Sequence, residues 1–299
     1  MDTFSISQLS QFSGIKPHTI RIWEQRYNAL RPNRSEGNTR YYDNSQLRRL
    51  LNIVSLSECG YKVSELCIMP DSSLFKLIGG SNVSKEESTR SHDTPGYFIY
   101  QLIAAGMSYD ELHFEKTLAQ SIARYGMRVT YTTVIYPLLE RLGLMWTSDT
   151  LPPAHEHFIS NLLRQKLFTA INALPPAKKG AKTWLLFLPE NELHEIGLLF
   201  SNYLVRQSGN KVIYLGSNVP LQSVEMAVEQ VKPDNLLFFL VHNELPENLQ
   251  QYFDQLNKIA GSKKVFVSAS EKMMSSVKIP KKFTWINSLE TFEKQLSFV

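Results

Sequence analysis

The feature that most constrains the fold is a series of short apolar runs between residues 184 and 286. The runs are WLLFL (184–188), VIYL (212–215), LLFFLV (236–241) and VFV (265–267), and a last strand is expected at 283–286. Strands that are apolar on both faces are typical of parallel sheets covered on both sides. Helical patterns at 194–208, 221–231 and 247–260 separate the runs, and another ends near Phe298. The sequence therefore predicts an α/β domain over residues 181–299, with a doubly wound, flavodoxin-like (Rossmann-type) parallel sheet.

The middle of the chain predicts a four-helix bundle over residues 96–175. Four amphipathic segments follow one another: 97–107, 110–126, 129–146 and 154–174. Apolar residues at helical spacing form a stripe that each helix buries against its neighbours. In the last segment the stripe consists of Phe158, Ile159, Leu162, Leu163, Leu167, Phe168 and Ile171. Residues 71–95 carry Ser, Gly, Asp and Pro without periodicity, which indicates a flexible linker.

The first 70 residues predict a helix-turn-helix followed by a hairpin. In FSISQLSQFSGIKPHTIRIWEQRY, a short helix is followed by a turn at Ser13-Gly14, and a second helix opens at Lys16-Pro17. LRPNRSEGNTRYY then contains Gly37-Asn38 between strand-like residues, which is a hairpin signal. Between residues 16 and 49 there are eight Lys or Arg against three acids, a local net charge of +5. Such a local excess is the electrostatic footprint of a phosphate-binding surface.

Length and composition limit the remaining possibilities. The 299 residues, 43% of them hydrophobic, suffice for two or three domains with their own cores. The formal net charge of the whole chain is only +4. Cys59 and Cys67 lack the partners of a zinc site and are expected to be small buried side chains in a reducing compartment. No signal peptide or membrane-spanning run is visible, so we expect a soluble cytoplasmic protein.

One histidine lies where a doubly wound sheet binds ligands. The stretch NELHEIGLLF (191–200) follows the first predicted strand, and its polar residues occupy the loop beyond the carboxyl end of that strand. His194 can direct one ring nitrogen out of the sheet while Glu192 accepts a hydrogen bond from the other. Gly197 would let a large planar ligand approach the backbone. The alternative is an ordinary solvated helix start.

The N-terminal region resembles the winged-helix DNA-binding domain of the MerR family of transcription regulators. The resemblance rests on KPHTIRIWEQRYNALRPNRSEGNTRYY and the following helix DNSQLRRLLNIVSLSECGYKVSEL. It implies a dimer that reads two-fold symmetric, double-stranded operator DNA. The residues expected at the DNA are Lys16, His18, Thr19, Arg21 and Arg26 of the recognition helix and Arg34, Arg40 and Tyr41 of the wing. The alternative is a basic helical hairpin that contacts proteins.

The sensor half resembles cobalamin-binding domains. Glu-x-His-x-x-Gly is similar to their signature, and the resemblance implies that His194 is the lower axial ligand of cobalt. In MWTSDTLPPAHEH, the spacing Trp-x9-Glu-His is similar to the helical cap of light-responsive, adenosylcobalamin-dependent MerR-like repressors of the CarH/LitR type. It implies that Trp146 covers the adenosyl group, Glu156 bonds its ribose and His157 contacts the upper ligand region. The alternative is that these residues are bundle core and a polar first helical turn.

The chain departs from this resemblance at three places. Ser-x-Leu, usual after the third strand, is replaced by residues 239–241, Phe-Leu-Val. Gly-Gly, usual after the fourth, is replaced by residues 268–270, Ser-Ala-Ser, so that Ser268 and Ala269 bring a Cβ to the expected tail-binding slot. After Trp146 stands Thr147 rather than a histidine, which excludes a bis-histidine photoproduct through that position.

These observations predict a non-enzymatic DNA-binding regulator, a repressor that senses adenosylcobalamin and light. In the dark the loaded protein is expected to assemble as a dimer of dimers on its operator, and light is expected to release it. The alternative is a cobalamin-independent regulator that binds a protein partner or another small ligand. A corrinoid-carrying enzyme subunit is disfavoured by the DNA-binding region, and no nucleophile–base constellation is recognisable.

Overall fold

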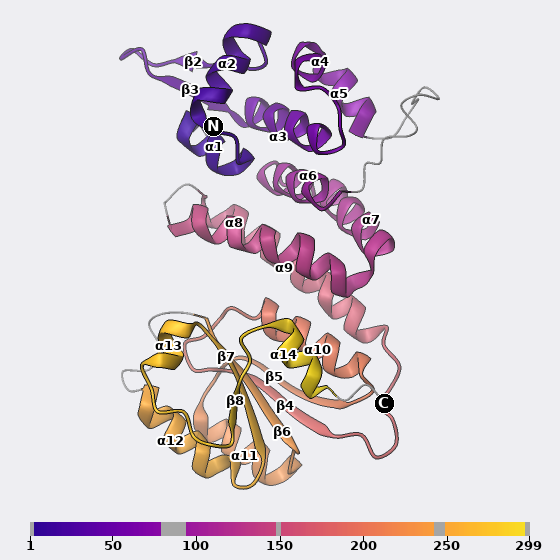
Figure 1. The fold of residues 1–299 in the computed structure, drawn as a ribbon, viewed down its shortest axis with the longest axis vertical. Coiled ribbons are helices and arrows are strands. Elements are labelled where there is room, and N and C mark those ends of the chain that lie inside the picture. The colour runs from indigo at the N-terminus through magenta and orange to yellow at the C-terminus, as the bar shows by residue number, and fades with distance from the viewer. Residues whose placement is uncertain (1–2, 79–93, 148–150, 242–248, 297–299) are drawn as a thin grey trace. The chain divides into compact units, whose positions relative to one another are not determined.

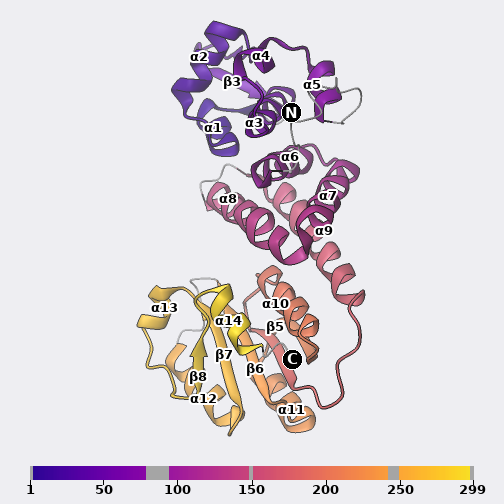
Figure 2. The same ribbon diagram turned by 45° about the vertical axis from the view of Figure 1, so that its right-hand side comes forward.

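The computed structural model describes residues 3–78, 94–147, 151–241 and 249–296 (Figures 1 and 2). The chain divides into two compact units, Met1–Leu162 and Leu163–Val299, which are described separately. The first unit holds the predicted DNA-binding region and most of the helical bundle. The second holds the end of the last bundle helix and the parallel sheet.

The N-terminal region has the predicted helix-turn-helix and wing. Ser5 begins the first helix with a reciprocal capping box to Gln8, and Gly14 ends it at φ 72°. Pro17 opens the second helix at a position that has no intrahelical donor to lose. The strands form an antiparallel sheet of order β1-β3-β2. The elements are β1 (Thr3–Phe4), α1 (Ile6–Ser13), α2 (Pro17–Tyr27), β2 (Asn33–Arg34), β3 (Arg40–Asp43), α3 (Asn44–Glu58), α4 (Val63–Ile68) and α5 (Asp71–Ile78).

The first part of the expected linker is a helix. Residues 71–78, expected to be flexible, form α5, whose Leu74 is fully buried. Asp71 lies in its first turn, where an acid stabilises the helix, and also pairs with Arg49 of α3 at 2.6 Å. The prediction was wrong here because a single buried leucine and one tertiary ion pair leave no periodicity in the sequence. The rest of the expected linker, residues 79–93, lies outside the described residues.

The middle of the chain forms the four predicted bundle helices. Gly126, at φ 75° and ψ 161°, interrupts α7 close to the predicted break between the second and third segments. Phe168, expected on the buried stripe of α9, is instead 39% exposed, whereas Ile159, Leu163 and Leu167 are fully buried. In the described part of the chain, no helix has both the length and the apolar composition needed to cross a membrane. The elements are α6 (Pro95–Met107), α7 (Glu111–Thr130), the π-helix η2 (Tyr131–Ile135), α8 (Tyr136–Thr147) and α9 (Pro153–Asn172).

A buried polar network joins the long helix after the wing to the bundle. Gln101 of α6 is 1% exposed and donates through Nε2 to Ser55 Oγ (2.7 Å) and Asn52 Oδ1 (3.2 Å) of α3. Its Oε1 lies 2.9 Å from Nε2 of His113 on α7. Since the amide nitrogen of Gln101 is already a donor, the imidazole donates to the amide oxygen. Buried polar groups satisfied in this way favour one register of the packed helices over others.

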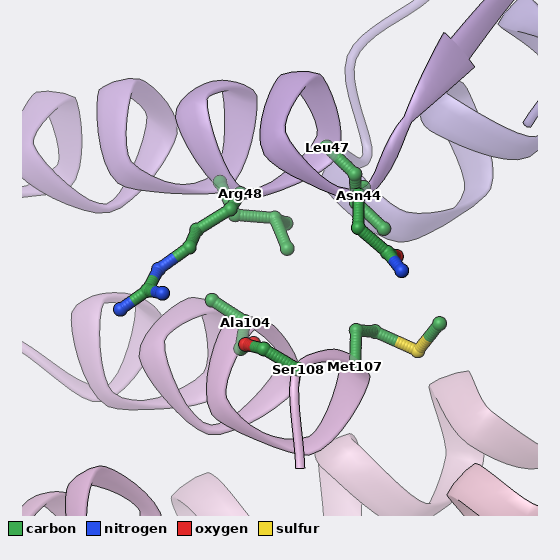
Figure 3. Close-up of a pocket in the computed structure, with 7 residues that line it drawn as sticks. Asn44, Leu47, Arg48, Ala104, Met107 and Ser108 are labelled. Atoms are coloured by element: carbon green, nitrogen blue, oxygen red, sulfur yellow. The ribbon is translucent and has the colours of Figure 1, made fainter. Parts of the chain in front are cut away.

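The edge of the same interface contains a small pocket (Figure 3). Figure 3 shows Asn44 and Arg48 of α3 opposite Ala104 and Met107 of α6 and its C-cap residue, Ser108. Arg48 is within 3.7 Å of Asp110, and its guanidinium lies over the Phe75 ring at 4.7 Å. Arg48 thus has partners in the protein, and so does Ser108, whose hydroxyl donates to the carbonyl of Ala104. The predicted site residues of the sensor half are not among those that line it.

Because His113 is part of this network, we expect the stability of the folded protein to depend on pH. Burial lowers the pKa of His113 below its ordinary value of 6.5, Arg48 and Lys116 act in the same direction, and Asp110 opposes them. The unfolded chain therefore takes up this proton at higher pH than the folded protein, so stability should fall as pH drops below about 6.5. Urea midpoints at pH 7.5 and 5.5 would measure this. The matched variant His113→Gln, which keeps a donor, should flatten the difference; an unchanged difference would contradict this expectation.

The second unit contains the predicted five-stranded parallel sheet. The strand order is β5-β4-β6-β7-β8, and all neighbouring pairs are parallel. This is the flavodoxin-like order, in which the first strand lies between the second and the third. The elements are β4 (Thr183–Pro189), α10 (Ile196–Gln207), β5 (Lys211–Val219), α11 (Leu221–Val231), β6 (Asn235–Leu240), α12 (Leu249–Ala260), β7 (Lys264–Ala269), α13 (Glu271–Ser275), β8 (Phe283–Trp285) and α14 (Leu289–Gln295).

Both faces of this sheet are buried, as the continuous apolar runs predict. On one face Phe187 and Phe238 pack with Phe253 of α12 and with residues of α11. On the other, Trp184 stacks on Phe266 with centroids 5.0 Å apart and meets Phe292 of α14 edge-on. The helix expected to end near Phe298 ends at Gln295, with Leu296 as its C-cap residue. The carboxyl ends of all five strands form one edge, and the loops there hold the predicted ligand site.

Candidate functional site

The predicted recognition helix α2 presents a basic surface. Lys16, which precedes the helix, and Arg21 and Arg26 are exposed, while Ile20 is fully buried and holds the helix against its neighbours. His18 is exposed, and its Nε2 lies 3.4 Å from the Thr19 hydroxyl. The helix is thus fixed by its inner face and leaves its cations available on the outer one.

The wing is joined to the recognition helix through a buried acid. Glu24 of α2 accepts a hydrogen bond from the Tyr42 hydroxyl and lies 3.5 Å from Arg40 of β3. Arg34 is exposed on β2, donates to Asn38 across the hairpin and pairs in the strand register with Arg40. Tyr41, half-buried, pairs with Asn33. Glu24 therefore fixes the angle between the wing and the helix that are expected to contact the same duplex.

Three of the eight cations counted in this region are held by acids or by main-chain carbonyl groups of the protein. Arg40 and Arg48 pair with Glu24 and Asp110. Arg49 donates to the carbonyl oxygens of Ala29 (2.6 Å), Cys67 (2.7 Å) and Met69 (2.9 Å). Lys16, Arg21, Arg26, Arg31 and Arg34 are the exposed cations. The nearby thiols of Cys59 and Cys67 form no disulfide and are buried as expected, and burial raises the pKa of Cys67 to about 11.

The Glu-x-His motif lies where the sequence places it, beyond the carboxyl end of β4. This strand has β5 on one side and β6 on the other, so the loop after it stands at the point where the strand order reverses. Crevices at such switch points are the usual ligand sites of doubly wound sheets. The side chain of His194 is 56% exposed there, whereas that of Glu192 is fully buried.

The carboxylate of Glu192 binds both the ring and the backbone of His194. Its Oε1 lies 2.6 Å from His194 Nδ1 and accepts from the backbone N–H of His194 at 3.0 Å. Its Oε2 accepts from the backbone N–H of Val241, the residue after β6, at 2.8 Å. With Nδ1 donating to the carboxylate, the ring tautomer carries its lone pair on Nε2. A carboxylate–histidine pair of this kind is the arrangement that orients imidazole ligands toward metals.

The backbone of this loop needs special conformations. Asn191 and Asn218 adopt left-handed φ values of 66° and 56°, which asparagine tolerates better than most residues. The Asn191 N–H donates to Asn218 Oδ1 (2.9 Å), and the Asn218 N–H donates to the carbonyl of Glu192 (3.1 Å). The loop after β4 is therefore bonded to the end of β5. Gly197 lies in the first turn of α10 and is half-buried.

The expected tail-slot residues lie on the same edge of the sheet. Ser268 and Ala269 end β7 and pair in register with Phe239 and Leu240 of β6. Both are half-buried, and the carbonyl of Ala269 accepts from the indole N–H of Trp285 at 3.1 Å. The parallel register of β6 and β7 thus brings residues 239–241, which replace Ser-x-Leu, next to residues 268–270, which replace Gly-Gly.

The three predicted cap residues flank one corner of the bundle. Trp146 lies at the end of α8 and is 44% exposed, and Glu156 and His157 lie in the first turn of α9. The Leu151 N–H donates to the carbonyl of Met145 (3.2 Å), which folds the start of α9 back toward the end of α8. His157 Nδ1 is 3.0 Å from Glu156 Oε2. The indole of Trp146 and the paired side chains of Glu156 and His157 are therefore not part of the buried bundle core.

Sequence reasoning did not single out His155, the residue that anchors this corner. Its ring is 2% exposed, stacks on Tyr109 with centroids 4.3 Å apart, and places Nδ1 3.3 Å from the carbonyl of Gly106. It thereby attaches the start of α9 to the turn between α6 and α7. His155 and His157, two residues apart, thus have different surroundings, which the sequence could reveal only through the helical position of His155 relative to the buried Ile159.

A second missed cluster adjoins His194. Glu195 is 7% exposed; its Oε1 accepts from the Tyr214 hydroxyl (2.9 Å), and its Oε2 lies 2.6 Å from a guanidinium nitrogen of Arg164. Burial, together with the neighbouring Glu195, raises the pKa of Tyr214 above its usual range. No local pattern links these residues, because they come from α9, the loop after β4 and β5.

Comparison with known families defines the class of protein. Residues 4–68 match the model of the MerR HTH family regulatory proteins, and residues 99–170 match the B12 binding domain model. The chain is a transcription regulator with a MerR-type helix-turn-helix domain and a B12-binding domain.

Its relatives agree with this class. The chain is homologous to two Myxococcus xanthus proteins, the HTH-type transcriptional repressors CarH and CarA. It is 27% identical to CarH over 259 residues, covering 86% of this chain and 85% of CarH. It is 29% identical to CarA over 247 residues, covering 82% and 79% respectively. Both the MerR and the cobalamin resemblances noted in the sequence are thereby confirmed at the level of domains.

A solved structure supports the fold. The monomethylamine corrinoid protein of Methanosarcina barkeri superposes with a TM-score of 0.55 at 15% identity, covering 69% of this chain and all of that one. At this identity the likeness concerns the fold, a helical bundle followed by a Rossmann-like parallel sheet.

Proposed function

We propose that this protein is a repressor whose operator binding is set by adenosylcobalamin and light. Residues 1–70 would bind DNA, residues 96–175 would cover the upper face of the corrinoid, and residues 181–299 would hold its lower face. The observation that carries the proposal is the Glu192–His194 pair at the switch point of the sheet, with 2.6 Å between Oε1 and Nδ1. The homologous repressors and the B12 binding domain match support it.

The residues present fit a corrinoid at its lower ligand. Glu192 accepts from the Nδ1 side of the imidazole, so Nε2 of His194 is the nitrogen with the lone pair that cobalt would take. Gly197 follows on the first turn of α10, where a missing Cβ admits a planar ring. Ser268 and Ala269 supply small side chains along the course expected for the displaced nucleotide tail.

The cap residues would determine which upper group is accepted. Bound adenosylcobalamin supplies a cobalt–carbon bond that light breaks. Trp146 would cover the adenosyl group by its exposed indole face, Glu156 would accept from the ribose hydroxyls, and His157, held by Glu156, would line the upper region. These contacts favour the assembled, DNA-binding state only while the upper group is present, because a ligand shifts an equilibrium by its differential affinity for the two states.

The protein itself supplies a direct test. Purified protein is mixed in the dark with adenosylcobalamin, methylcobalamin or hydroxocobalamin, freed of unbound ligand, and examined by absorbance and size-exclusion chromatography before and after green light. We expect retention of adenosylcobalamin, a larger assembly in the dark and a smaller one after illumination. Retention of no corrinoid would contradict the proposal and favour a regulator that binds a protein or another small ligand. Retention without a light-dependent change of size would contradict the light switch alone.

A further inference from the structure

The residue after His194 is a buried acid that does not cap its own helix. Glu195 is the N-cap residue of α10, a position whose side chain usually accepts from the first backbone N–H groups of the helix. No such side-chain bond is formed here. The carboxylate is directed instead to the Tyr214 hydroxyl and to Arg164, at 2.9 and 2.6 Å. Tertiary partners, rather than the local helix, therefore determine its position.

The main chain of Glu195 is itself bonded on both sides, to the histidine loop and to α10. The Glu195 N–H donates to the carbonyl of Leu193 (2.8 Å), and the Glu195 carbonyl accepts from the Leu199 N–H (2.9 Å). A residue whose carboxylate is held at both oxygens and whose main chain is bonded on both sides restrains the peptide that joins residues 194 and 195. Glu192 fixes the imidazole of His194, and Glu195 fixes the main chain that carries it.

The space around Glu195 leaves little room for another arrangement. A Cβ built on Gly216, which has φ 83°, would stand 3.4 Å from Glu195 Oε1. Glu195 is 7% exposed, and such a buried carboxylate is costly unless a cation and a donor compensate it. Arg164 supplies the cation, and its own side chain is 42% exposed, so it brings little desolvation cost of its own.

We propose that Arg164 and Tyr214 are positioning residues for His194, which hold Glu195 and thereby direct the imidazole toward cobalt. The inference rests on the proposed function, in that His194 is taken as the cobalt ligand. It adds a connection that the Glu-x-His-x-x-Gly signature does not contain. Arg164 belongs to α9, the helix whose first turn carries Glu156 and His157.

The test asks which nitrogen binds cobalt. Protein labelled with ¹⁵N is loaded with cob(II)alamin, and the electron paramagnetic resonance spectrum is recorded. A ¹⁵N ligand from His194 gives doublet splitting, whereas the unlabelled benzimidazole of the cofactor gives a triplet. Wild-type protein should show the doublet. In Arg164→Gln and Tyr214→Phe we expect a mixture of doublet and triplet, and in Arg164→Gln the cobalamin Kd should rise about 10- to 100-fold, as for lost outer partners of metal ligands.

Two matched variants separate positioning from general damage. Arg164→Lys retains the charge and should keep most of the doublet signal. Arg206→Gln removes another arginine of the same unit, one that bonds Asn202 (2.8 Å) and the carbonyl of Val212 (3.2 Å) away from the histidine loop, and it should leave spectrum and Kd unchanged. Thermal melts of every variant check that the sheet domain is folded.

Each result has a distinct meaning. If wild-type protein binds no corrinoid, or binds it with the benzimidazole triplet, the proposed role of His194 fails, and this inference fails with it. If wild-type protein shows the doublet while Arg164→Gln and Tyr214→Phe match it in both splitting and Kd, the positioning role is overturned and the proposed function stands. A loss shared equally with Arg206→Gln would also overturn the positioning role.

Discussion

Replacing His194 with alanine is expected to raise the Kd for cobalamin by at least about 10- to 100-fold, the range for losing an outer-shell partner of a metal ligand. The variant removes the nitrogen that Glu192 orients, while the backbone N–H of residue 194 can still donate to the same carboxylate. The loop should therefore keep its fold while the ligand is lost. Retained corrinoid after gel filtration, and its absorption spectrum, measure the effect.

The matched control for this variant is His18→Ala. His18 is an exposed histidine of α2, remote in sequence from the sheet, and its removal should leave corrinoid retention unchanged. Addition of free imidazole to His194→Ala should restore part of the wild-type spectrum, because the vacated position admits a small ligand. A His194→Ala protein with wild-type affinity and an unaltered spectrum would show that cobalt is not bound through this residue.

Replacing Arg49 with methionine is expected to lower the free energy of unfolding by about 2–4 kcal/mol, because three partly buried carbonyl oxygens lose a charged donor. The single side chain of Arg49 bonds three parts of the chain: the loop after α2, the end of α4 and Asp71. Methionine fills similar volume but donates nothing. Urea unfolding followed by circular dichroism measures the loss.

The matched variant Arg21→Met should behave in the opposite way. Arg21 is exposed on α2, so its removal should change stability by less than about 0.5 kcal/mol. It should weaken binding to a duplex selected from a random pool by about 1–3 kcal/mol, the usual cost of a lost base contact. Equal losses of stability in the two variants would contradict the division of this basic region into structural and DNA-facing cations.

The fold was predictable where apolar residues repeat. The apolar runs that begin at Trp184, Leu236 and Val265 are continuous because both faces of the sheet are covered. Their alternation with helical segments along the chain predicted a parallel, doubly wound sheet. Helix α5 was not predictable, because its stability depends on Leu74 and on the Arg49–Asp71 pair rather than on periodicity. Phe168 was misplaced because it lies at the edge of the apolar stripe: Leu167 and Ile171 on the same helix are buried, whereas Phe168 is exposed.

The candidate site was predictable only in its local part. Glu192 and His194 are two residues apart, so their pairing follows from the motif itself. Glu195 lies in the same stretch but carries no signal, since its partners Arg164 and Tyr214 belong to a bundle helix and a neighbouring strand. Contacts of this kind depend on how elements are placed in three dimensions, which no spacing along the chain encodes.

The network around Gln101 limits how freely these domains can be exchanged. Its amide nitrogen donates to Asn52 and Ser55 of α3, and its amide oxygen accepts from His113 of α7. The hydrogen bonds of Gln101 therefore depend on which residues stand in two other helices. A chimera that joins this DNA-binding region to another sensor at residues 79–93 would separate the amide from its partners. A junction placed after His113 would transfer the whole network, and recombination that preserves function should favour that boundary.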